Sequence, residues 1–534
     1  MDVFFSEWSK TATGWSLLLF LGALPCLFGL YLCFVAPPRH PQQIPSVPFW
    51  VTLLPFFFDV DQQETFQQYI AKPLQTHGAI KMFFAGRWNV IVQRPAMLAE
   101  IFRNEHIYHK SGNQEKIPHS VLAEYLGNFR ERAQLREISR TDLDLRLAGS
   151  NIISARGDEW RRYRAVIQPG LQTSFDSSAV FRHAQRLSAV LLGLQERNRR
   201  QGVPVQGVLQ RYSSANLLRC VLGLSDLSMI KMDQDAPLHS IQTSLKRYLF
   251  QPIFLNFPVL DWLGWAIPSR RQARNLIQDF STELQMQIVQ AHPPGSSTTS
   301  VGGRLATAWR DGTLTTQQFR DNLNVLYVAG HENPQLLLTS ALYLLGKFPK
   351  VQERLRAEIE QYGTIDEGDT PTVSWERLPY LSATILECAR LFPPISQLIN
   401  RRVATPTWLA GNLHLTPGMY VGYHSYATNR DPTTWGPDAD EFRPERWGHT
   451  HEQIFAAYRR AKARAEFITF HGGPRACLGE KFALLQMRVS LLVLVRSLSW
   501  TLDPEWTDQM MPAGPLHPRG LRLMFITHDK DAAT

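Results

Sequence analysis

The chain has 534 residues, of which 19% are charged and 44% hydrophobic, and its formal net charge is +9. This composition is ordinary for a globular protein with a large core, so it excludes a wholly disordered chain or a coiled coil. The positive charge is spread out, without a basic block or zinc-finger spacing, so we expect no nucleic-acid partner. The five cysteines are odd in number and far apart, which predicts neither a disulfide framework nor a zinc site.

An apolar run at residues 14–36 contains no charged residue and is long enough to cross a bilayer as a helix. A cleaved signal peptide is the alternative, but the run is longer than a signal-peptide core and no basic segment precedes it. Acidic residues outnumber basic ones before the run and Arg39 follows it. The positive-inside rule therefore predicts a short lumenal N-terminus at residues 1–13, a single-pass transmembrane anchor and a cytoplasmic body. The run Phe49–Phe58 is too short to span again and predicts either core or an interfacial patch.

A proline-rich stretch at residues 37–48 predicts a stiff hinge between the anchor and a catalytic domain at residues 49–534. Within this domain, Ala79–Gln93 has the alternation of a β-hairpin. Helical periodicity dominates from about residue 158 to 350, and strand-like runs return near residues 401–426. The predicted fold class is therefore mostly α with small β-sheets.

The sequence FHGGPRACLG begins at Phe470 and precedes an apolar run with the spacing of a long buried helix. Cys477 is therefore expected just before a helix N-terminus, where partial positive charge and free N–H groups favour a thiolate. Gly473 and Gly479 would let the backbone approach a flat cofactor, and Arg475 can pair with a carboxylate. Taken alone, a lone cysteine is more often a small buried hydrophobe.

This stretch resembles the haem-binding loop of cytochromes P450, FxxGxRxCxG, and matches it at Phe470, Gly473, Arg475, Cys477 and Gly479. The resemblance implies the cytochrome P450 fold and haem b with Cys477 as the axial ligand of the iron. It also implies electrons from NADPH through NADPH–cytochrome P450 reductase. The anchor and hinge are similar to those of microsomal eukaryotic members, which implies the endoplasmic reticulum membrane with the catalytic domain in the cytoplasm.

Other segments are similar to conserved parts of the same family. Glu387 and Arg390 stand at i and i+3 on a predicted helix and resemble its ExxR motif, although such a pair is also ordinary on a surface. With Arg446 in FRPERW, the resemblance implies a buried charge network that braces the haem loop. Trp160 and Arg164 resemble the family's WxxxR, whose two residues contact a haem propionate.

Two adjacent arginines follow the helix that carries Glu387. One of Arg401 and Arg402 resembles the family's strand arginine that reaches a propionate, and the spacing to the following Ala-Gly pair favours Arg401.

Residues 314–348 predict another long helix, with a capping box at Thr315. Pro334 cannot donate a hydrogen bond to the carbonyl of Gly330, so we expect the helix to open there and form a groove for dioxygen and water. A proline kink in an ordinary core helix is the alternative.

The segment AGHENP, from Ala329 to Pro334, resembles the oxygen-activation motif AGx(D/E)T of cytochromes P450. Ala329, Gly330 and Glu332 match, but Asn333 replaces the threonine. An amide donates and accepts hydrogen bonds but is no hydroxyl relay, so we expect proton delivery through Glu332 with Asn333 as a donor. The segment is also similar to that of the fungal dityrosine-forming group, which couples phenols oxidatively.

The predicted function is a haem-thiolate monooxygenase that hydroxylates or oxidatively couples a small organic substrate in fungal secondary metabolism. Its predicted partners are the reductase, a membrane and that substrate. Two alternatives stay open at this stage: a haem-thiolate isomerase or dehydratase that needs no reductase, and a haem-binding protein without catalysis.

Overall fold

The computed structural model describes residues 35–118, 120–126, 150–224, 237–249, 251–296, 299–363 and 373–528. The predicted anchor at residues 14–36 lies outside this part of the chain, apart from its last two residues. Among the described residues, no helix combines the length and the apolar composition that a membrane crossing requires.

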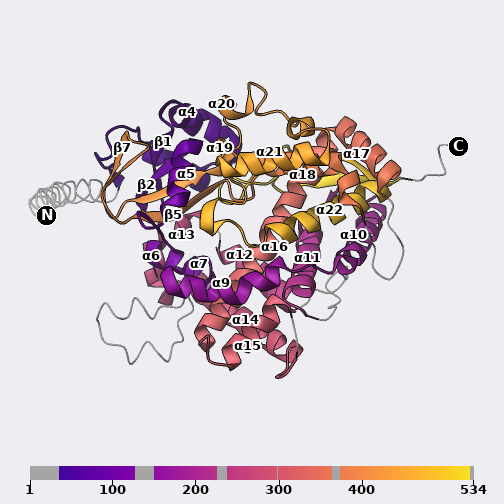
Figure 1. Cartoon of the computed structure of the whole chain (residues 1–534), viewed down its shortest axis with the longest axis horizontal. Helices are drawn as coiled ribbons and strands as arrows, with labels where there is room; N and C mark the ends of the chain where they lie inside the picture. The colour runs from indigo at the N-terminus through magenta and orange to yellow at the C-terminus, as the bar shows by residue number, and fades with distance from the viewer. Residues whose placement is uncertain are drawn as a thin grey trace, which may run out of the picture.

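Strands lie at two ends of the molecule, most of them beside the N-terminal part of the chain and a smaller group near its C-terminus, and helices fill the rest (Figure 1). The larger sheet has the order β1-β2-β8-β5-β3, and β2 and β8 are its parallel pair. Its strands are β1 (Ala79–Phe84), β2 (Arg87–Val92), β3 (Tyr108–Lys110), β5 (Gln397–Val403) and β8 (Tyr420–His424). The smaller sheets are formed by β4 (Val203–Pro204), β9 (Leu498–Leu502) and β10 (Arg522–Thr527), and by β6 (Thr407–Leu409) and β7 (Leu413–Leu415).

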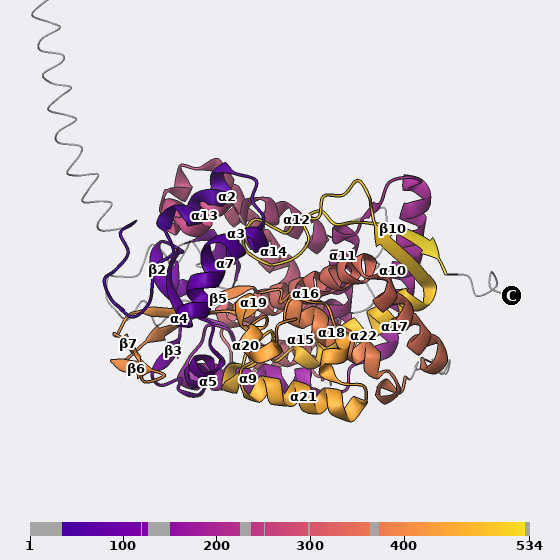
Figure 2. The ribbon, with the colours of Figure 1, turned by 90° about the horizontal axis from the view of Figure 1, so that it is seen from above.

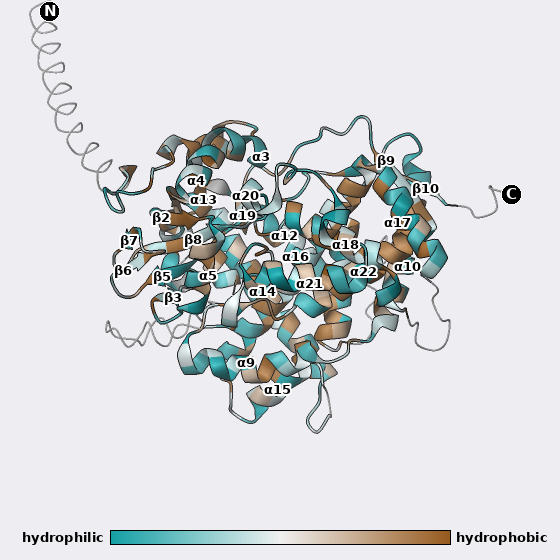
Figure 3. Ribbon diagram, turned by 45° about the horizontal axis from the view of Figure 1, so that its top comes forward, coloured by the Kyte–Doolittle hydropathy of each residue, from teal (hydrophilic) through white to brown (hydrophobic). Residues whose placement is uncertain are grey.

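The long helices form the body of the protein around the central α16. They are α9 (Gly157–Gln172), α10 (Ser177–Asn198), α11 (Gln206–Asn216), α12 (Pro237–Leu249), α14 (Pro268–Ala291), α15 (Val301–Arg310), α16 (Thr316–Lys347), α17 (Pro349–Tyr362), α18 (Pro379–Leu391), α21 (His451–Ala463) and α22 (Glu480–Ser497). Hydrophilic and hydrophobic residues alternate along the outer helices in Figure 3, as expected where one face of a helix covers a core.

Shorter helical segments connect these elements. They are η2 (Phe49–Leu53), α2 (Leu54–Phe57), α3 (Gln62–Thr65), η3 (Phe66–Ala71), α4 (Lys72–His77), α5 (Pro95–Arg103), α6 (Asn113–Lys116), α7 (Val121–Tyr125), η5 (Leu217–Val221), α13 (Pro252–Asn256), η6 (Pro258–Trp265), η7 (Trp375–Arg377), α19 (Ser425–Thr428), α20 (Pro432–Trp435), η8 (Pro444–Trp447) and η9 (Gly473–Arg475). Figure 2 shows α2 and α13 on the same edge of the molecule, above the larger sheet.

The predicted hairpin is confirmed and consists of β1 and β2 in antiparallel register. Ala85 and Gly86 join the strands, and both have positive φ angles, 55° and 76°. Positive φ at both central residues gives a turn whose twist matches that of the flanking strands.

The proline-rich stretch, predicted as a stiff hinge, lies along β1. Lys81 Nζ donates to the carbonyl oxygens of Pro38 and Pro41, at 2.9 and 3.1 Å, and the backbone N–H of Val47 donates to the carbonyl of Lys81. Trp88 Nε1 donates to the carbonyl of Val35 at 3.0 Å. The described start of the chain is thus fixed against the sheet.

The predicted capping box at the start of α16 is confirmed, because the side chains of Thr315 and Gln318 each accept from the other's backbone N–H. The expected opening at Pro334 is wrong: α16 continues through this residue to Lys347. Neighbouring helices bury most of α16, and this packing outweighs the loss of one backbone hydrogen bond.

Candidate active site

Cys477 lies in a short loop that leads into α22. Its backbone N–H donates to the carbonyl of Phe470 at 2.9 Å, and α22 begins at Glu480 with Gly479 as its N-cap. The side chain of Cys477 is exposed, yet the surrounding protein desolvates the thiol. The thiol is therefore accessible, although the protein atoms around it exclude much of the neighbouring water.

Two opposing effects act on the protonation of Cys477. Burial raises the pKa of the thiol to about 11, whereas the N–H groups of Gly479 and Glu480, at the start of α22, lower it in the predicted direction. Desolvation is the larger of the two effects on the polypeptide by itself. A metal ion that binds this sulfur has to displace the proton.

The two glycines of the loop have different surroundings. A Cβ on Gly473 would lie 2.5 Å from the carbonyl oxygen of Phe102, and the residue has a φ of 65°. Gly479 has only Cys477 Sγ near its absent Cβ, at 4.0 Å. The predicted close approach to a flat cofactor therefore suits Gly479, whereas Gly473 is required by the contact with α5.

Arg475 and the pair on α9 meet beside this loop. Arg475 Nε donates to Glu105 at 2.9 Å, and its guanidinium lies 4.0 Å above the Trp160 ring. Arg164 Nη1 donates to the carbonyl of Pro474 at 2.7 Å. The structure thus brings Glu105 and the α9 pair, which are far from the cysteine loop in sequence, into contact with that loop.

Arg401 and Arg402 point in opposite directions, as successive residues of a strand do. Arg402 is exposed and pairs with Glu115 at 2.7 Å. Arg401 is buried, with 2% exposure, and none of the described residues accepts a hydrogen bond from its Nε. Arg401 is therefore the arginine that faces inward.

Lys110 stands opposite Arg401 in the antiparallel pairing of β3 with β5. Burial holds the pKa of Lys110 well below its ordinary value, and the charges of Arg401 and Arg475 lower it further. Glu105 is the carboxylate that opposes this effect, and it is already bonded to Arg475. Three cations therefore share one carboxylate at this place.

This surplus of positive charge suits a cofactor with two carboxylates. Haem b carries two propionates, and the buried Nε of Arg401 is a free donor for one of them. The accessible sulfur of Cys477 supplies the ligand type expected for an iron porphyrin with a thiolate. The residues present thus fit haem b.

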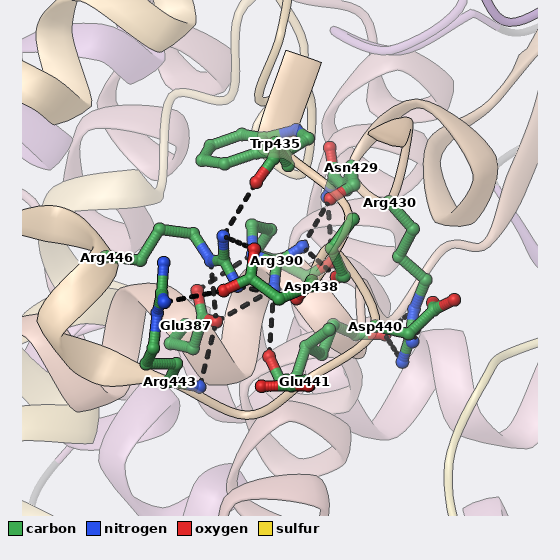
Figure 4. A network of polar contacts seen from close by, with 12 residues as sticks. Glu387, Arg390, Asn429, Arg430, Trp435, Asp438, Asp440, Glu441, Arg443 and Arg446 are labelled. Carbon is green, nitrogen blue, oxygen red and sulfur yellow. Dashed lines mark hydrogen bonds and ion pairs between the residues drawn. The ribbon is translucent and has the colours of Figure 1, made fainter. Parts of the chain in front are cut away.

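Glu387, Arg390 and Arg446 form a buried network next to the loop (Figure 4). Arg390 binds both oxygens of Glu387 at 2.8 Å, and neither side chain is exposed. Trp447 Nε1 donates to the same carboxylate at 3.0 Å, and Arg446 Nε donates to it at 3.3 Å. Every oxygen of this carboxylate is satisfied, which a buried charge requires.

The other candidate residues lie on α16. Most of this helix is buried, but one of its faces is partly exposed. Leu326, Ala329 and Asn333 are half-buried and recur at i, i+3 and i+7, on one face of the helix. Asn333 Nδ2 lies 3.4 Å from the carbonyl of Ala329, which is a weak hydrogen bond. The Asn333 amide is thus held loosely.

Gly330 differs from its prediction. The sequence predicts a groove beside it for dioxygen and water, but a Cβ on Gly330 would lie 2.5 Å from Leu217 Cδ1. The missing side chain therefore makes room for Leu217 of η5 and not for an open groove.

Glu332 faces α12. Lys246 Nζ lies 3.0 Å from its carboxylate, and Gln242 Nε2 donates to it at 3.3 Å. The same amide lies 2.6 Å from His331 Nε2. Because His331 Nδ1 donates to the carbonyl of Tyr327, Nε2 accepts from Gln242 and the ring is neutral. Burial lowers the pKa of His331 to about 4, in agreement with this tautomer.

Sequence reasoning missed the partners that complete both sides of the site. Glu105, Lys110, Gln242 and Lys246 are polar residues in segments without a recognised motif. Only the pairing of β3 with β5 and the packing of α12 on α16 reveal them.

Comparisons with known proteins agree with this geometry. The sequence model of the family described as Cytochrome P450 matches residues 116–525. Cytochrome P450-DIT2 of Saccharomyces cerevisiae is 38% identical over 95% of this chain and 97% of its own length. Cytochrome P450 monooxygenase xanG of Aspergillus fumigatus is 36% identical over 94% of this chain and 90% of its own. Cytochrome P450 monooxygenase ptmK of Penicillium ochrochloron is 29% identical over about half of each chain, 49% and 51%.

Proposed function

Because the chain belongs to the cytochrome P450 family, we propose that Cys477 is the thiolate through which it holds haem b. The protein is a haem-thiolate monooxygenase that oxidises a small organic substrate with electrons that NADPH supplies through a reductase. The accessible sulfur beside three cations that share one carboxylate is the observation that supports the assignment. The relatives named as monooxygenases favour this function over an isomerase, a dehydratase or a protein without catalysis.

Haem b with a thiolate ligand supplies oxygen chemistry, since the thiolate pushes electron density toward O–O cleavage. Arg401, Lys110, Arg164 and Arg475 would hold its propionates. The Glu387 network binds the backbone on both sides of α20, because Arg390 Nη1 donates to the carbonyls of Asn429 and Ala439.

On the opposite side, Glu332 is the group that can carry a proton, and Lys246 and Gln242 orient its carboxylate. Asn333 donates or accepts a hydrogen bond but cannot relay a proton through a hydroxyl. This set is compatible with hydroxylation and with oxidative coupling of aromatic substrates, and we propose a place in fungal secondary metabolism.

We also propose the endoplasmic reticulum membrane as the location, with the body in the cytoplasm. Large apolar side chains on α2, η6 and the residues beside them are exposed, among them Phe57 (74%), Trp262 (60%) and Trp265 (74%). Exposed apolar patches of this kind bind membranes or partners, and aromatic side chains suit the interface. The charge-free run at residues 14–36 supports the same location.

A carbon monoxide difference spectrum of the reduced full-length protein tests the assignment of Cys477. We expect the long-wavelength Soret band of thiolate ligation, and its loss in Cys477→Ser at equal chain concentration. The band should persist in Cys388→Ser, a control at a buried cysteine on α18. An imidazole-type spectrum, or a band that survives Cys477→Ser, would contradict the proposal.

A further inference from the structure

A pocket of about 360 Å³ lies between the β1–β2 hairpin, the end of α6 and η6. Most of its wall is apolar and includes Phe83, Ile117, Phe257 and Trp262. Pockets of this size with apolar walls and a few polar groups bind small organic molecules. The polar groups therefore decide which molecule fits.

Two cations, Arg87 and Lys116, supply the polar side chains of this wall. Lys116 is 6% exposed, and its Nζ donates to the carbonyl of Ile399 at 2.8 Å. Arg87 Nη2 donates to the carbonyl of Lys116 at 2.7 Å, which holds the two residues side by side. The Nε of Arg87 is buried and has no hydrogen-bond partner among the residues that the structure describes.

Within the described parts of the chain, no carboxylate pairs with either cation. The neighbouring acid, Glu115, is bound by Arg156 and Arg402 instead. Burial, followed by the charge of Arg87, lowers the pKa of Lys116 to about 8. A buried lysine beside a half-buried arginine, whose Nε meets no acceptor among the described residues, favours an anion between them.

The position of the pocket connects it to the site around Cys477. Ile399, which accepts from Lys116, lies on β5 two residues before Arg401. Two residues of a strand span about 7 Å. The pair of cations is therefore separated from the proposed propionate site by one short stretch of the same strand.

We propose that this pocket binds an apolar carboxylic acid, with its carboxylate between Arg87 and Lys116 and its hydrocarbon or aromatic part against Phe257 and Trp262. The inference rests on the proposed function and extends it, because it makes apolar carboxylic acids the substrate class. The guanidinium of Arg87 can form two parallel hydrogen bonds with a carboxylate. A single negative charge suits this pair of cations, because Lys116 has a lowered pKa of about 8. The remaining wall offers apolar contact along the rest of the molecule.

Calorimetric titration of the full-length protein tests this proposal without turnover. The probes are phenylalkanoic acids of increasing chain length, each compared with its neutral primary amide. The best acid should bind at least about tenfold more tightly than its amide, because only the acid forms charge-assisted hydrogen bonds. Arg87→Met and Lys116→Met should each reduce this ratio, and the double variant should remove it.

Lys72→Met, at an exposed lysine on α4, is the matched control and should leave the ratio unchanged. Variants are compared only when their carbon monoxide spectrum and melting midpoint equal those of the parent, which separates a lost site from a lost fold. Equal binding of acid and amide by the parent, or an acid preference that survives the double variant, would overturn the proposal. A normal acid preference with no thiolate band would leave the pocket standing and refute the assignment of Cys477.

The pH dependence of binding separates the two cations. The affinity of the parent for the acid should fall as pH rises through the pKa of Lys116, near 8, because the neutral amine no longer attracts the carboxylate. Arg87 stays charged over this range. Lys116→Met should therefore bind more weakly but without this fall, and an unchanged fall in that variant would refute the role of Lys116.

Discussion

The two sides of the proposed active site are held in different ways. In the Glu387 network, Glu387 and Arg390 have no exposed surface, and Arg446 and Trp447 bind the same carboxylate. On α16, the side chain of Glu332 is 15% exposed and that of its partner Lys246 is 25% exposed, and both Lys246 and Gln242, which bind Glu332, lie on α12. The carboxylate of Glu387 is therefore held by residues of several elements, whereas, within the described part of the chain, the carboxylate of Glu332 is held by residues of α12 alone.

This difference matches two chemical tasks. A ligand loop has to keep one geometry, so a fully satisfied buried network suits it. An acid that moves protons has to reach water and change its charge, so partial exposure and few partners suit it. The comparison therefore predicts that substitutions in the Glu387 network reduce stability and haem content, and that substitutions of Glu332 or its neighbours on α16 reduce turnover.

The largest expected effect is that of Glu387→Ala. This change leaves Arg390 buried without a counter-charge, so the free energy of unfolding should fall by about 3–5 kcal/mol, with loss of bound haem. Urea unfolding and the haem content per chain measure this. Asp158→Ala is the control, since it removes another i, i+3 pair, with Arg161, that is mostly exposed. Its cost should stay under about 1 kcal/mol, and similar costs at both positions would refute the comparison.

An intermediate effect is expected at Glu332. Glu332→Ala should reduce turnover by about 100-fold, and more than Asn333→Ala, because only the acid carries a proton. The loss of turnover in Lys246→Met should lie between those of the other two variants, since it removes the ion-pair partner of Glu332 and keeps the acid. Steady-state product formation at equal haem content measures all three. Equal losses for Glu332→Ala and Asn333→Ala, or the reverse order, would contradict this proton route.

The smallest effect is a pH dependence of stability that arises from His331. Its pKa in the folded protein, about 4, lies below the value near 6.5 of an unfolded chain. The unfolded state therefore binds the extra proton first, and stability present above pH 6.5 is lost as pH falls toward 4. Between pH 7 and pH 5 the loss should be about 2 kcal/mol.

Urea midpoints at pH 7 and pH 5 measure this loss. The parent should lose more stability on acidification than His331→Asn, and His77→Asn, at an exposed histidine, should behave like the parent. A parent-like loss in His331→Asn would show that other groups cause the acid sensitivity.

Local chemistry allowed much of the fold to be predicted. The turn at Ala85 and Gly86, the capping box at Thr315 and the N-cap at Gly479 each depend on a few neighbouring residues. The opening at Pro334 was predicted by the same kind of reasoning and was wrong, because tertiary packing around α16 is not a local property.

The site could be predicted only in part for a related reason. Spacing alone placed Glu387 with Arg390 on one helix turn and Cys477 before a helix. The partners Lys110, Glu105 and Lys246 come from distant segments, and strand register or helix packing brings them in. The burial that raises the pKa of Cys477 is likewise a consequence of the assembled fold.

The facing pair of Lys110 and Arg401 has a consequence for how the chain matures. The fold itself encloses two adjacent cations, and the carboxylate of Glu105, which is already bonded to Arg475, offsets only part of their repulsion. Any ligand that binds only the folded state stabilises it by mass action, and here that ligand also supplies the missing negative charge. We therefore expect haem supply to set the cellular half-life of this protein. A pulse-chase experiment in haem-limited cells should show rapid degradation that Lys110→Met slows.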